Sequence, residues 1–259
     1  MILLLFASVL LLTKSTEKKP DTHKREKLSK RTRAAVIIIL LLIPLTLFIW
    51  AAYFDKHDFY IVAFLIMLES MAPFFFVFEK RKPKARELVL ISALCAITVA
   101  GRAAFFMLPQ FKPVMAMTII SAVAFGGETG FLVGAVSMLV SNIMFSQGPW
   151  TPWQMFSMGI IGFFAGVLYK ANLLRRNKLS LSLFGAVSAI VIYGGIMNPA
   201  SALIWGRSVL NLKMVMTYYL SGFPMDCVHA AATFIFLWII SEPMLEKLDR
   251  IKLKYGLIG

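Results

Sequence analysis

The sequence predicts an all-α membrane protein that crosses the bilayer several times. Of its 259 residues, 59% are hydrophobic and 15% are charged, and the mean hydropathy is +0.78. Several apolar segments approach the roughly 20 residues that a helix needs to cross a bilayer core of about 30 Å. These segments are continuous and do not alternate between polar and apolar residues, which excludes a membrane β-barrel.

The positive charge follows membrane topology. The formal net charge is +14, and 22 of the 27 Lys and Arg residues lie in alternate connections, at 14–33, 80–86, 170–178 and 247–254. Basic residues concentrate on the cytoplasmic side of membrane proteins. We therefore expect a multi-pass protein of the cell membrane whose basic loops and C-terminus are cytoplasmic and attracted to anionic lipid of the bilayer. The same distribution argues against nucleic-acid binding.

The chain divides into three parts. Residues 1–33 combine an apolar run, too short to span unaided, with a basic cytoplasmic segment; whether residues 1–12 insert in the membrane is left open. Residues 34–84 form a predicted transmembrane hairpin, with helices at 34–53 and 59–78, and a basic linker. Residues 85–259 form the predicted substrate-binding membrane domain, with helices at 87–108, 113–125, 131–145, 154–169, 181–197 and 225–240.

Glycine and proline separate the core helices. Residues 109–112 are expected to form an outer turn and residues 126–130 an inner one, since glycine permits positive φ. Residues 198–224 are expected to form a long outer connection, and long structured loops usually have a function. An alternative interpretation extends the last helix back to Met214, with a kink at residues 222–224.

Residues 146–154, with the sequence SQGPWTPWQ, lie between two apolar segments. Proline limits the entropy lost when such a loop becomes ordered, and an indole offers a flat apolar face with one N–H donor. One interpretation is that Trp150, Trp153 and Gln154 contact a small molecule. The other is that both indoles belong to the aromatic belt at the membrane interface.

Further aromatic and amide side chains are expected at the same membrane face. They are Phe111, Asn142, Asn198, Trp205 and Tyr218. An amide both donates and accepts hydrogen bonds, so it suits the edge of a heteroaromatic ring. Because ligand sites are mostly apolar hollows with a few polar groups, we expect these residues to bind substrate together with the tryptophan segment.

Arg102 lies inside the first predicted core helix, where a charge is costly unless it is paired or faces water. Asp226 is the expected partner, and His229 shares its helix face because residues three apart are neighbours. The group is either a structural ion pair between Arg102 and Asp226 or part of a polar cavity in which Asp226 and His229 bind substrate. One Asp and one His fall short of a metal-ligand set, and we expect no metal ion and no cofactor.

The first core helix also carries small residues at every fourth position, Ser92, Ala96, Ala100 and Ala104. Such a stripe lets another helix approach closely, either within the subunit or from a separate membrane protein. No phosphate-binding loop, zinc-protease motif or activated serine or cysteine motif occurs in the sequence. We therefore expect neither an enzyme nor a protein with its own energy source.

The core from about residue 86 resembles the substrate-binding S component of energy-coupling-factor (ECF) vitamin transporters. The resemblance rests on the six helices, the Ala96 and Ala100 repeat, and three segments: GGETGFLVGA at 126–135, GPWTPWQM at 148–155 and DCVHA at 226–230. It covers about two thirds of the chain, and the N-terminal hairpin departs from the six-helix pattern.

The resemblance implies a membrane subunit that binds a vitamin or vitamin precursor at its outer face. It implies that a transmembrane coupling subunit contacts Ala96, Ala100 and Ala104, and that two ATPase subunits supply the energy. The tryptophan segment points to the cobalamin and cobalamin-precursor group, although a flavin or a pterin also suits several aromatic rings. The alternatives are a lipid-modifying membrane enzyme that uses Asp226, His229 and Arg102, and a structural assembly protein.

Overall fold

The computed structural model describes residues 45, 46, 65, 69, 85–205 and 212–256. The predictions for residues 1–33 and for most of the hairpin at 34–84 therefore lie outside the described residues. Within the hairpin, the Thr46 hydroxyl donates to the Glu69 carboxylate at 2.7 Å. This bond joins one residue from each of the two predicted hairpin segments.

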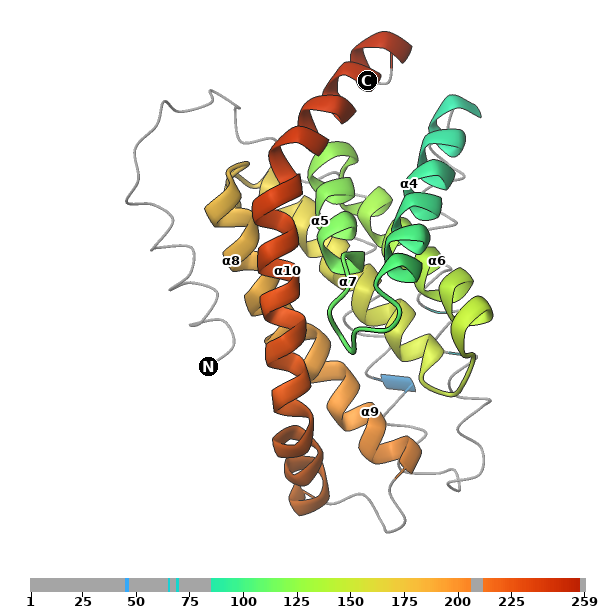
Figure 1. Ribbon diagram of the computed structural model, residues 1–259, viewed down its shortest axis with the longest axis vertical. Helices are drawn as coiled ribbons and strands as arrows, with labels where there is room; N and C mark the ends of the chain where they lie inside the picture. The colour runs from blue at the N-terminus through green and yellow to red at the C-terminus, as the bar shows by residue number, and fades with distance from the viewer. Residues whose placement is uncertain (1–44, 47–64, 66–68, 70–84, 206–211, 257–259) are drawn as a thin grey trace.

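All regular elements in the described part of the chain are helices (Figure 1). In order they are α4 (Ala85–Ala104), α5 (Val114–Phe125), α6 (Gly127–Phe145), α7 (Thr151–Lys170), α8 (Lys178–Ser188), the π-helix η3 (Ala189–Gly194), α9 (Gly195–Trp205) and α10 (Leu212–Tyr255). Helices α8, η3 and α9 run on as one 28-residue span. Five segments of the described chain are long and apolar enough to cross a membrane, so the predicted polytopic helical core is confirmed.

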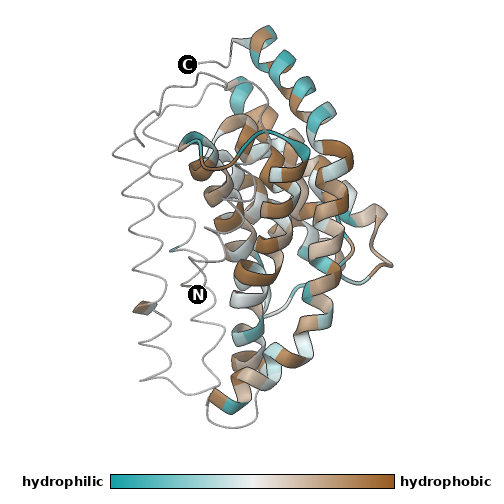
Figure 2. Cartoon of the chain, turned by 90° about the vertical axis from the view of Figure 1, so that its left-hand side faces the viewer, coloured by the Kyte–Doolittle hydropathy of each residue, from teal (hydrophilic) through white to brown (hydrophobic). Residues whose placement is uncertain are grey.

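The bundle has two chemically different ends. The connection 170–178 and the last turns of α10 lie at one end, which we call the basic end (Figure 1). The start of α7 and the end of α9 lie at the other end, which carries Trp150 and Trp205 and which we call the aromatic end. In Figure 2 apolar residues line the middle of the bundle, and hydrophilic residues gather on the last turns of α10.

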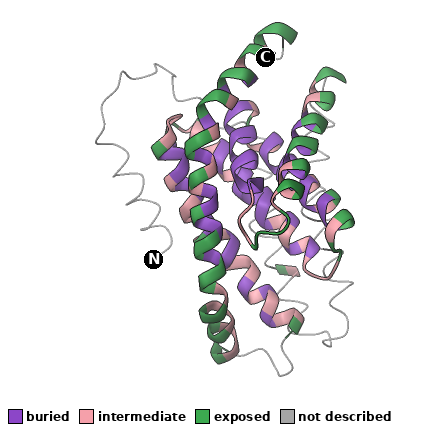
Figure 3. Ribbon diagram, viewed as in Figure 1, coloured by how far each residue is buried: buried purple, intermediate pink, exposed green. Residues whose placement is uncertain are grey.

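Helix α5 is the centre of the core. Every residue from Val114 to Ala124 is buried, and Figure 3 shows this helix enclosed by its neighbours. Its 12 residues measure about 18 Å, well short of a bilayer core of about 30 Å. The connection 105–113 between α4 and α5 therefore lies part-way along the bundle and not at its aromatic end, as Figure 1 shows.

Helices α6 and α7 pack at backbone distance because glycines line their interface. A Cβ on Gly130 would lie 2.8 Å from the Gly162 carbonyl oxygen, and a Cβ on Gly166 would lie 2.2 Å from the Gly127 nitrogen. Glycine therefore allows an approach that any larger side chain would block. The predicted inner turn at 126–130 is wrong for this reason: Gly126 alone, at φ 97°, makes the reversal, and α6 begins at Gly127.

The loop in the tryptophan segment, residues 146–154, is shorter than predicted. Only residues 146–150 connect α6 to α7, because α7 begins at Thr151 and includes Pro152 and Trp153. Proline is well suited to the first turn of a helix, where its missing N–H has no partner to lose. Trp150 is the last residue of the loop and directly precedes the first residue of α7.

The predicted outer connection at 198–224 is also largely helical. Helix α9 continues to Trp205, and α10 begins at Leu212 and runs through Pro224 and Pro243, as the alternative interpretation proposed. Pro199 lies inside α9 and cannot donate to the carbonyl of Gly195 four residues earlier. The Tyr219 hydroxyl donates to that carbonyl at 2.9 Å, so a side chain of α10 replaces the missing bond.

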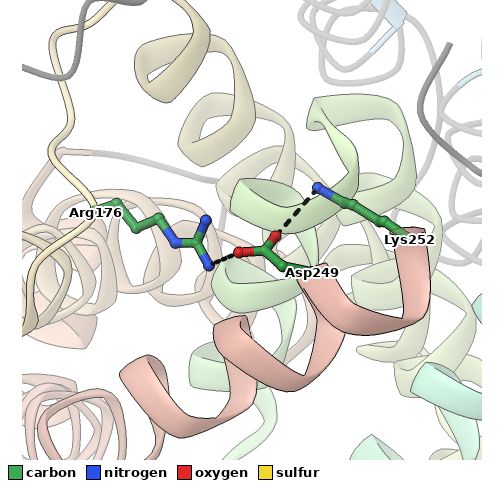
Figure 4. A network of polar contacts seen from close by, with 3 residues as sticks. All are labelled: Arg176, Asp249 and Lys252. Carbon is green, nitrogen blue, oxygen red and sulfur yellow. Dashed lines mark hydrogen bonds and ion pairs between the residues drawn. The ribbon is translucent and has the colours of Figure 1, made fainter. Parts of the chain in front are cut away.

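At the basic end a polar network joins α10 to the connection between α7 and α8. Arg176 bonds the Asp249 carboxylate, and Lys252 lies 3.8 Å from the other oxygen of the same group (Figure 4). Lys178 pairs with Glu242 at 3.1 Å. These groups are partly exposed, so each pair contributes little stability and chiefly fixes where the connection lies.

Candidate functional site

A chain of polar side chains runs across the aromatic half of the bundle through Asn142. This residue is fully buried near the end of α6. Its amide nitrogen donates to the Thr151 hydroxyl at 3.0 Å and to the Gln154 carbonyl at 2.8 Å. Its amide oxygen accepts from the Arg102 guanidinium at 2.6 Å. Two acceptors for the nitrogen and one cation for the oxygen leave the amide with one orientation.

Arg102 does not form the predicted ion pair with Asp226. The guanidinium extends from the last turn of α4 toward α6, where it bonds the Ser141 hydroxyl as well as Asn142. Asp226 lies on α10 and faces α9, where its carboxylate accepts from the Asn198 amide at 2.8 Å. The sequence identified two polar residues in helices correctly, but packing directs them to different neighbours.

Two glycines enclose the Asn198 and Asp226 pair. A Cβ on Gly194 would lie 2.5 Å from the Asp226 carboxylate, and a Cβ on Gly222 would lie 2.2 Å from the Asn198 amide oxygen. Asn198 and Asp226 are both buried, and each satisfies part of the other's hydrogen-bonding capacity. Backbone without side chains on either side therefore makes room for this polar pair inside the bundle.

Tyr193 connects the two polar groups. It is buried in the π-helix η3, its side chain contacts Gln154, and it lies within electrostatic reach of both Arg102 and Asp226. Its ring meets His229 edge-on at 4.6 Å. His229 is buried as well, and its Nδ1 has no hydrogen-bond partner among the described residues. A π-helix of this kind is often found at functional sites.

The aromatic residues predicted to bind substrate occupy four different environments. Trp150 stacks on Trp205 with ring centroids 6.1 Å apart, and Trp205 is 60% exposed. Trp153 is buried in the core at the first turn of α7. Phe111 packs between Phe105 and Phe236, at 6.2 and 5.4 Å, and so holds the connection 105–113 against α10. Tyr218 is half-buried on α10.

Lys112 adds a second cation beside Arg102. A Cβ on Gly101 would lie 2.8 Å from Pro113. Arg102 follows Gly101 and Lys112 precedes Pro113, so the backbones of the two basic residues lie close together. Burial and the nearby charge of Arg102 both lower the pKa of the Lys112 amine. Its Nζ donates to the Leu108 carbonyl at 2.7 Å.

The small-residue stripe of α4 faces away from the bundle. Ala96, Ala100 and Ala104 are all exposed, together with Ser92 and Ala103. The stripe does not pack against the other described helices of the core. Thr98 and Val99, on the opposite face of α4, are buried against the bundle.

Sequence reasoning missed Tyr193, Thr151, Ser141 and Tyr219. Tyr193, Ser141 and Tyr219 are single hydroxyls in apolar segments. Thr151 lies within the tryptophan segment, where sequence reasoning singled out only the two indoles and Gln154. The Tyr-Gly-Gly run at 193–195 was the one local signal, because paired glycines in an apolar helix mark a close approach of backbone or side chain. Among the described residues no group of three or more His, Cys, Asp or Glu could hold a metal ion.

These features define a polytopic helical membrane protein with a buried polar cluster in the half of the bundle that carries the stacked indoles. Residues 82–247 match the family described as the S component of ECF-type riboflavin transporters. The chain belongs to this family, and it is a substrate-binding membrane subunit of an ECF transporter. The family consists of transporter subunits and not of enzymes, so the lipid-modifying alternative is set aside.

The chain is also similar to curated bacterial relatives. The chain is 24% identical to a UPF0397 protein of Aliivibrio salmonicida over 174 residues, which are 65% of this chain and 92% of that one. It is 28% identical to a UPF0397 protein of Vibrio atlanticus over 125 residues, 46% of this chain and 68% of the relative. No solved structure matches the chain.

Proposed function

We propose that the domain at 85–259 binds a planar heteroaromatic vitamin of the flavin class at its aromatic end. The observation that carries this proposal is the pair of polar groups joined by Tyr193, one around Asn142 and one around Asp226. They offer donors and acceptors deep in an apolar bundle, below the stacked indoles of Trp150 and Trp205. Convergent polar groups in an apolar setting are typical of small-molecule sites.

The flavin class is favoured over cobalamin because the matching family is the riboflavin type. An isoalloxazine ring presents carbonyls and ring nitrogens along its edge, which suits the side-chain amides of Gln154 and Asn198. Its flat faces suit indoles. Trp150 and Trp205 would then cover the ring at the aromatic end, with Phe111 deeper along the bundle and His229, Asp226 and Tyr218 on the side toward α10.

The transport cycle requires partners. In the proposed arrangement the aromatic end faces outward, the basic end faces the cytoplasm, and the exposed stripe Ala96, Ala100 and Ala104 docks on a transmembrane coupling subunit. Two ATPase subunits supply the energy for which this chain carries no motif. The ligand then leaves the site when the coupled complex moves it inward.

Direct binding tests the proposal. The full chain in detergent or nanodiscs is titrated into riboflavin, and quenching of flavin fluorescence gives the Kd. Trp150→Ala and Trp205→Ala are expected to weaken binding about ten-fold, since stacking on an aromatic face contributes on the order of 1 kcal/mol. Trp238→Ala is the matched control, because Trp238 stacks on Phe234 along the outer face of α10.

Competition identifies the substrate class. Cobalamin, a pterin and riboflavin are each offered against bound flavin. Displacement by riboflavin alone supports the flavin class. Tight binding of cobalamin with no binding of any flavin would replace the flavin class with the cobalamin group, and no binding of any of the three would refute the proposal.

A further inference from the structure

A buried carboxylate on the inward face of α10 lies against the π-helix η3. Asp226 shares this face with His229, Thr233 and Leu237, which are all buried and follow one another at intervals of three or four residues. A Cβ on Gly194, the last residue of η3, would lie 2.5 Å from the Oδ2 atom of Asp226. The carboxylate therefore lies directly against backbone, and the residue remains 8% exposed.

Among the described residues no cation balances the charge of Asp226. The ion pairs in this part of the chain join Arg176, Lys178 and Lys252 to carboxylates at the basic end. From the described residues the Asp226 carboxylate accepts one hydrogen bond, which the Asn198 amide donates to Oδ2 at 2.8 Å. Its other oxygen, Oδ1, therefore keeps its capacity to accept. An unpaired carboxylate inside a membrane bundle is costly and usually marks a functional site.

His229 supplies a second, independent observation at the same place. It lies one turn from Asp226, it is 3% exposed, and its Nδ1 has no hydrogen-bond partner in the part of the chain that the structure describes. Its ring meets that of Tyr193 edge-on at 4.6 Å, and Tyr193 directly precedes the glycine that lies against Asp226. Buried polar atoms are nearly always hydrogen-bonded, so this nitrogen indicates a partner from outside the described chain.

Asn198 fixes the direction of the carboxylate. A Cβ on Gly222 would lie 2.2 Å from the Oδ1 atom of Asn198, so this amide is held between α9 and α10 with its nitrogen toward Asp226. The bond to Oδ2 then orients the carboxylate and leaves its second oxygen for another donor. A fixed acceptor one helical turn from an imidazole matches a group that both donates and accepts.

We propose that Asp226 and His229 recognise one edge of the transported ligand, an N–H group beside a carbonyl, as in a cyclic imide. The Asp226 carboxylate accepts from the N–H group, and Nδ1 of His229 donates to the carbonyl. This inference rests on the proposed function and narrows it to a flavin-class ligand whose imide edge faces α10. The carboxylate discriminates between ligands, because one that lacks the N–H group leaves the charge unpaired.

Two flavins that differ at one nitrogen test the proposal. Riboflavin and 3-methylriboflavin, in which a methyl group replaces the imide hydrogen, are titrated against the full chain in nanodiscs. The parent is expected to bind riboflavin about ten-fold more tightly, the gain typical of one hydrogen bond to a charged group. In Asp226→Asn the amide oxygen still accepts from Asn198, but an N–H donor takes the place of Oδ1. This variant is expected to bring the two affinities within about two-fold of each other.

Glu246→Gln is the matched control for the loss of a carboxylate. Glu246 is exposed at the basic end of the same helix, and the variant should keep the full preference for riboflavin. His229→Phe retains a ring against Tyr193 and is expected to weaken both flavins alike, by about ten-fold, since both keep the imide carbonyls. Unchanged affinities of His229→Phe would overturn the assignment of the imidazole.

The stability of the ligand-free chain gives a measurement that does not depend on any flavin. A carboxylate that serves a ligand is unpaired in its absence, so Asp226→Asn is expected to raise the thermal midpoint or leave it unchanged. A lower midpoint, or a variant that does not fold as judged by size-exclusion chromatography, would show that the charge serves the fold. Either result would overturn the proposal, whichever flavins bind.

The remaining outcomes separate this inference from the proposed function. Equal binding of the two flavins by the parent, or a preference that Asp226→Asn retains, would overturn the inference and still support the flavin class. No binding of either flavin, with a raised or unchanged midpoint for Asp226→Asn, would refute the flavin class. That result would support a carboxylate that pairs with an N–H group of a different ligand.

Discussion

At the scale of single residues, Asn142 determines how the candidate site is organised. Its amide connects α4, α6 and α7 through Arg102, Thr151 and Gln154. A predicted ligand residue thus has a structural task as well, because it orients the cation and the glutamine that would meet the ligand.

Asn142→Ala is expected to lower the stability of the protein by about 1–3 kcal/mol, since it leaves buried polar groups without partners. Thermal unfolding in detergent measures the effect. Ser146→Ala, an exposed position just beyond α6, is the control and should leave the midpoint unchanged. A midpoint for Asn142→Ala equal to that of the control would show that the network is not needed for folding.

Gly194→Ala is expected to weaken ligand binding about ten-fold while the fold is retained. Its new Cβ would displace the Asp226 carboxylate, which is the flexible end of a side chain and can move. The neighbouring Gly195→Ala is a matched control, because nothing lies within 4 Å of a Cβ there. Equal affinities of the two variants would separate Asp226 from ligand binding.

At the scale of elements, the close packing of α6 and α7 depends on glycines that the sequence analysis placed in a turn. Gly127 and Gly130 are helical and meet the backbone of α7. Two glycines in succession indicate a break in a helix when only local preference is considered. The glycines are helical instead, because the backbone of α7 packs against them. Helix α7 lies farther along the sequence, so local preference gives no sign of this contact.

Gly162→Ala is expected to destabilise the protein by about 1–3 kcal/mol, since its Cβ would lie 2.4 Å from the Gly130 carbonyl oxygen. Backbone cannot yield as a side chain does, so the helices must separate. Chemical unfolding followed by circular dichroism measures the loss, with Gly195→Ala again as control. An unchanged or higher stability of Gly162→Ala would contradict the backbone contact.

The proline-containing helices show the same limit of local reasoning. Pro199 and Pro224 led to the prediction of a loop, because proline removes a helical hydrogen bond. In the structure both are helical, and Tyr219 of α10 satisfies the Gly195 carbonyl that Pro199 leaves free. A compensating donor more than twenty residues away has no local signature.

At the scale of the whole molecule, one face of α4 remains available for a partner. The stripe of Ala96, Ala100 and Ala104 is exposed, whereas the polar cluster lies on the other side of this helix, toward α6. In the proposed arrangement, docking and ligand binding therefore use separate surfaces of one bundle. Arg102 belongs to the polar cluster and lies in the last turn of α4, two residues from Ala100 and from Ala104. The alanine stripe and the polar cluster are therefore closest in the sequence at this residue.

Ala96→Leu is expected to abolish vitamin uptake in cells and leave the ligand Kd within about two-fold of the parent, because a larger side chain blocks close helix contact. Uptake of labelled vitamin and binding to the purified chain are measured side by side. Val140→Leu, on the exposed face of α6, is the control. Equal loss of uptake and binding would contradict the separation of the two surfaces.

The sequence alone determined the helical membrane fold and the approximate spans. The length of an apolar segment and the charges at its ends depend on that segment and its solvent. They can therefore be read from the sequence without knowing which other segment packs against it. It also selected Asn142, Asn198, Asp226 and His229, because polar residues in apolar helices are few.

Only the tertiary structure decided which of these residues meet. Arg102 is bound by Ser141 and Asn142 instead of Asp226, and Tyr193 joins two clusters that lie on different helices. Side-chain pairing depends on the rotation of each helix about its own axis and on the distance between helices. Both were set by contacts between distant residues, above all the glycines of α6 and α7 and the π-helix that carries Tyr193.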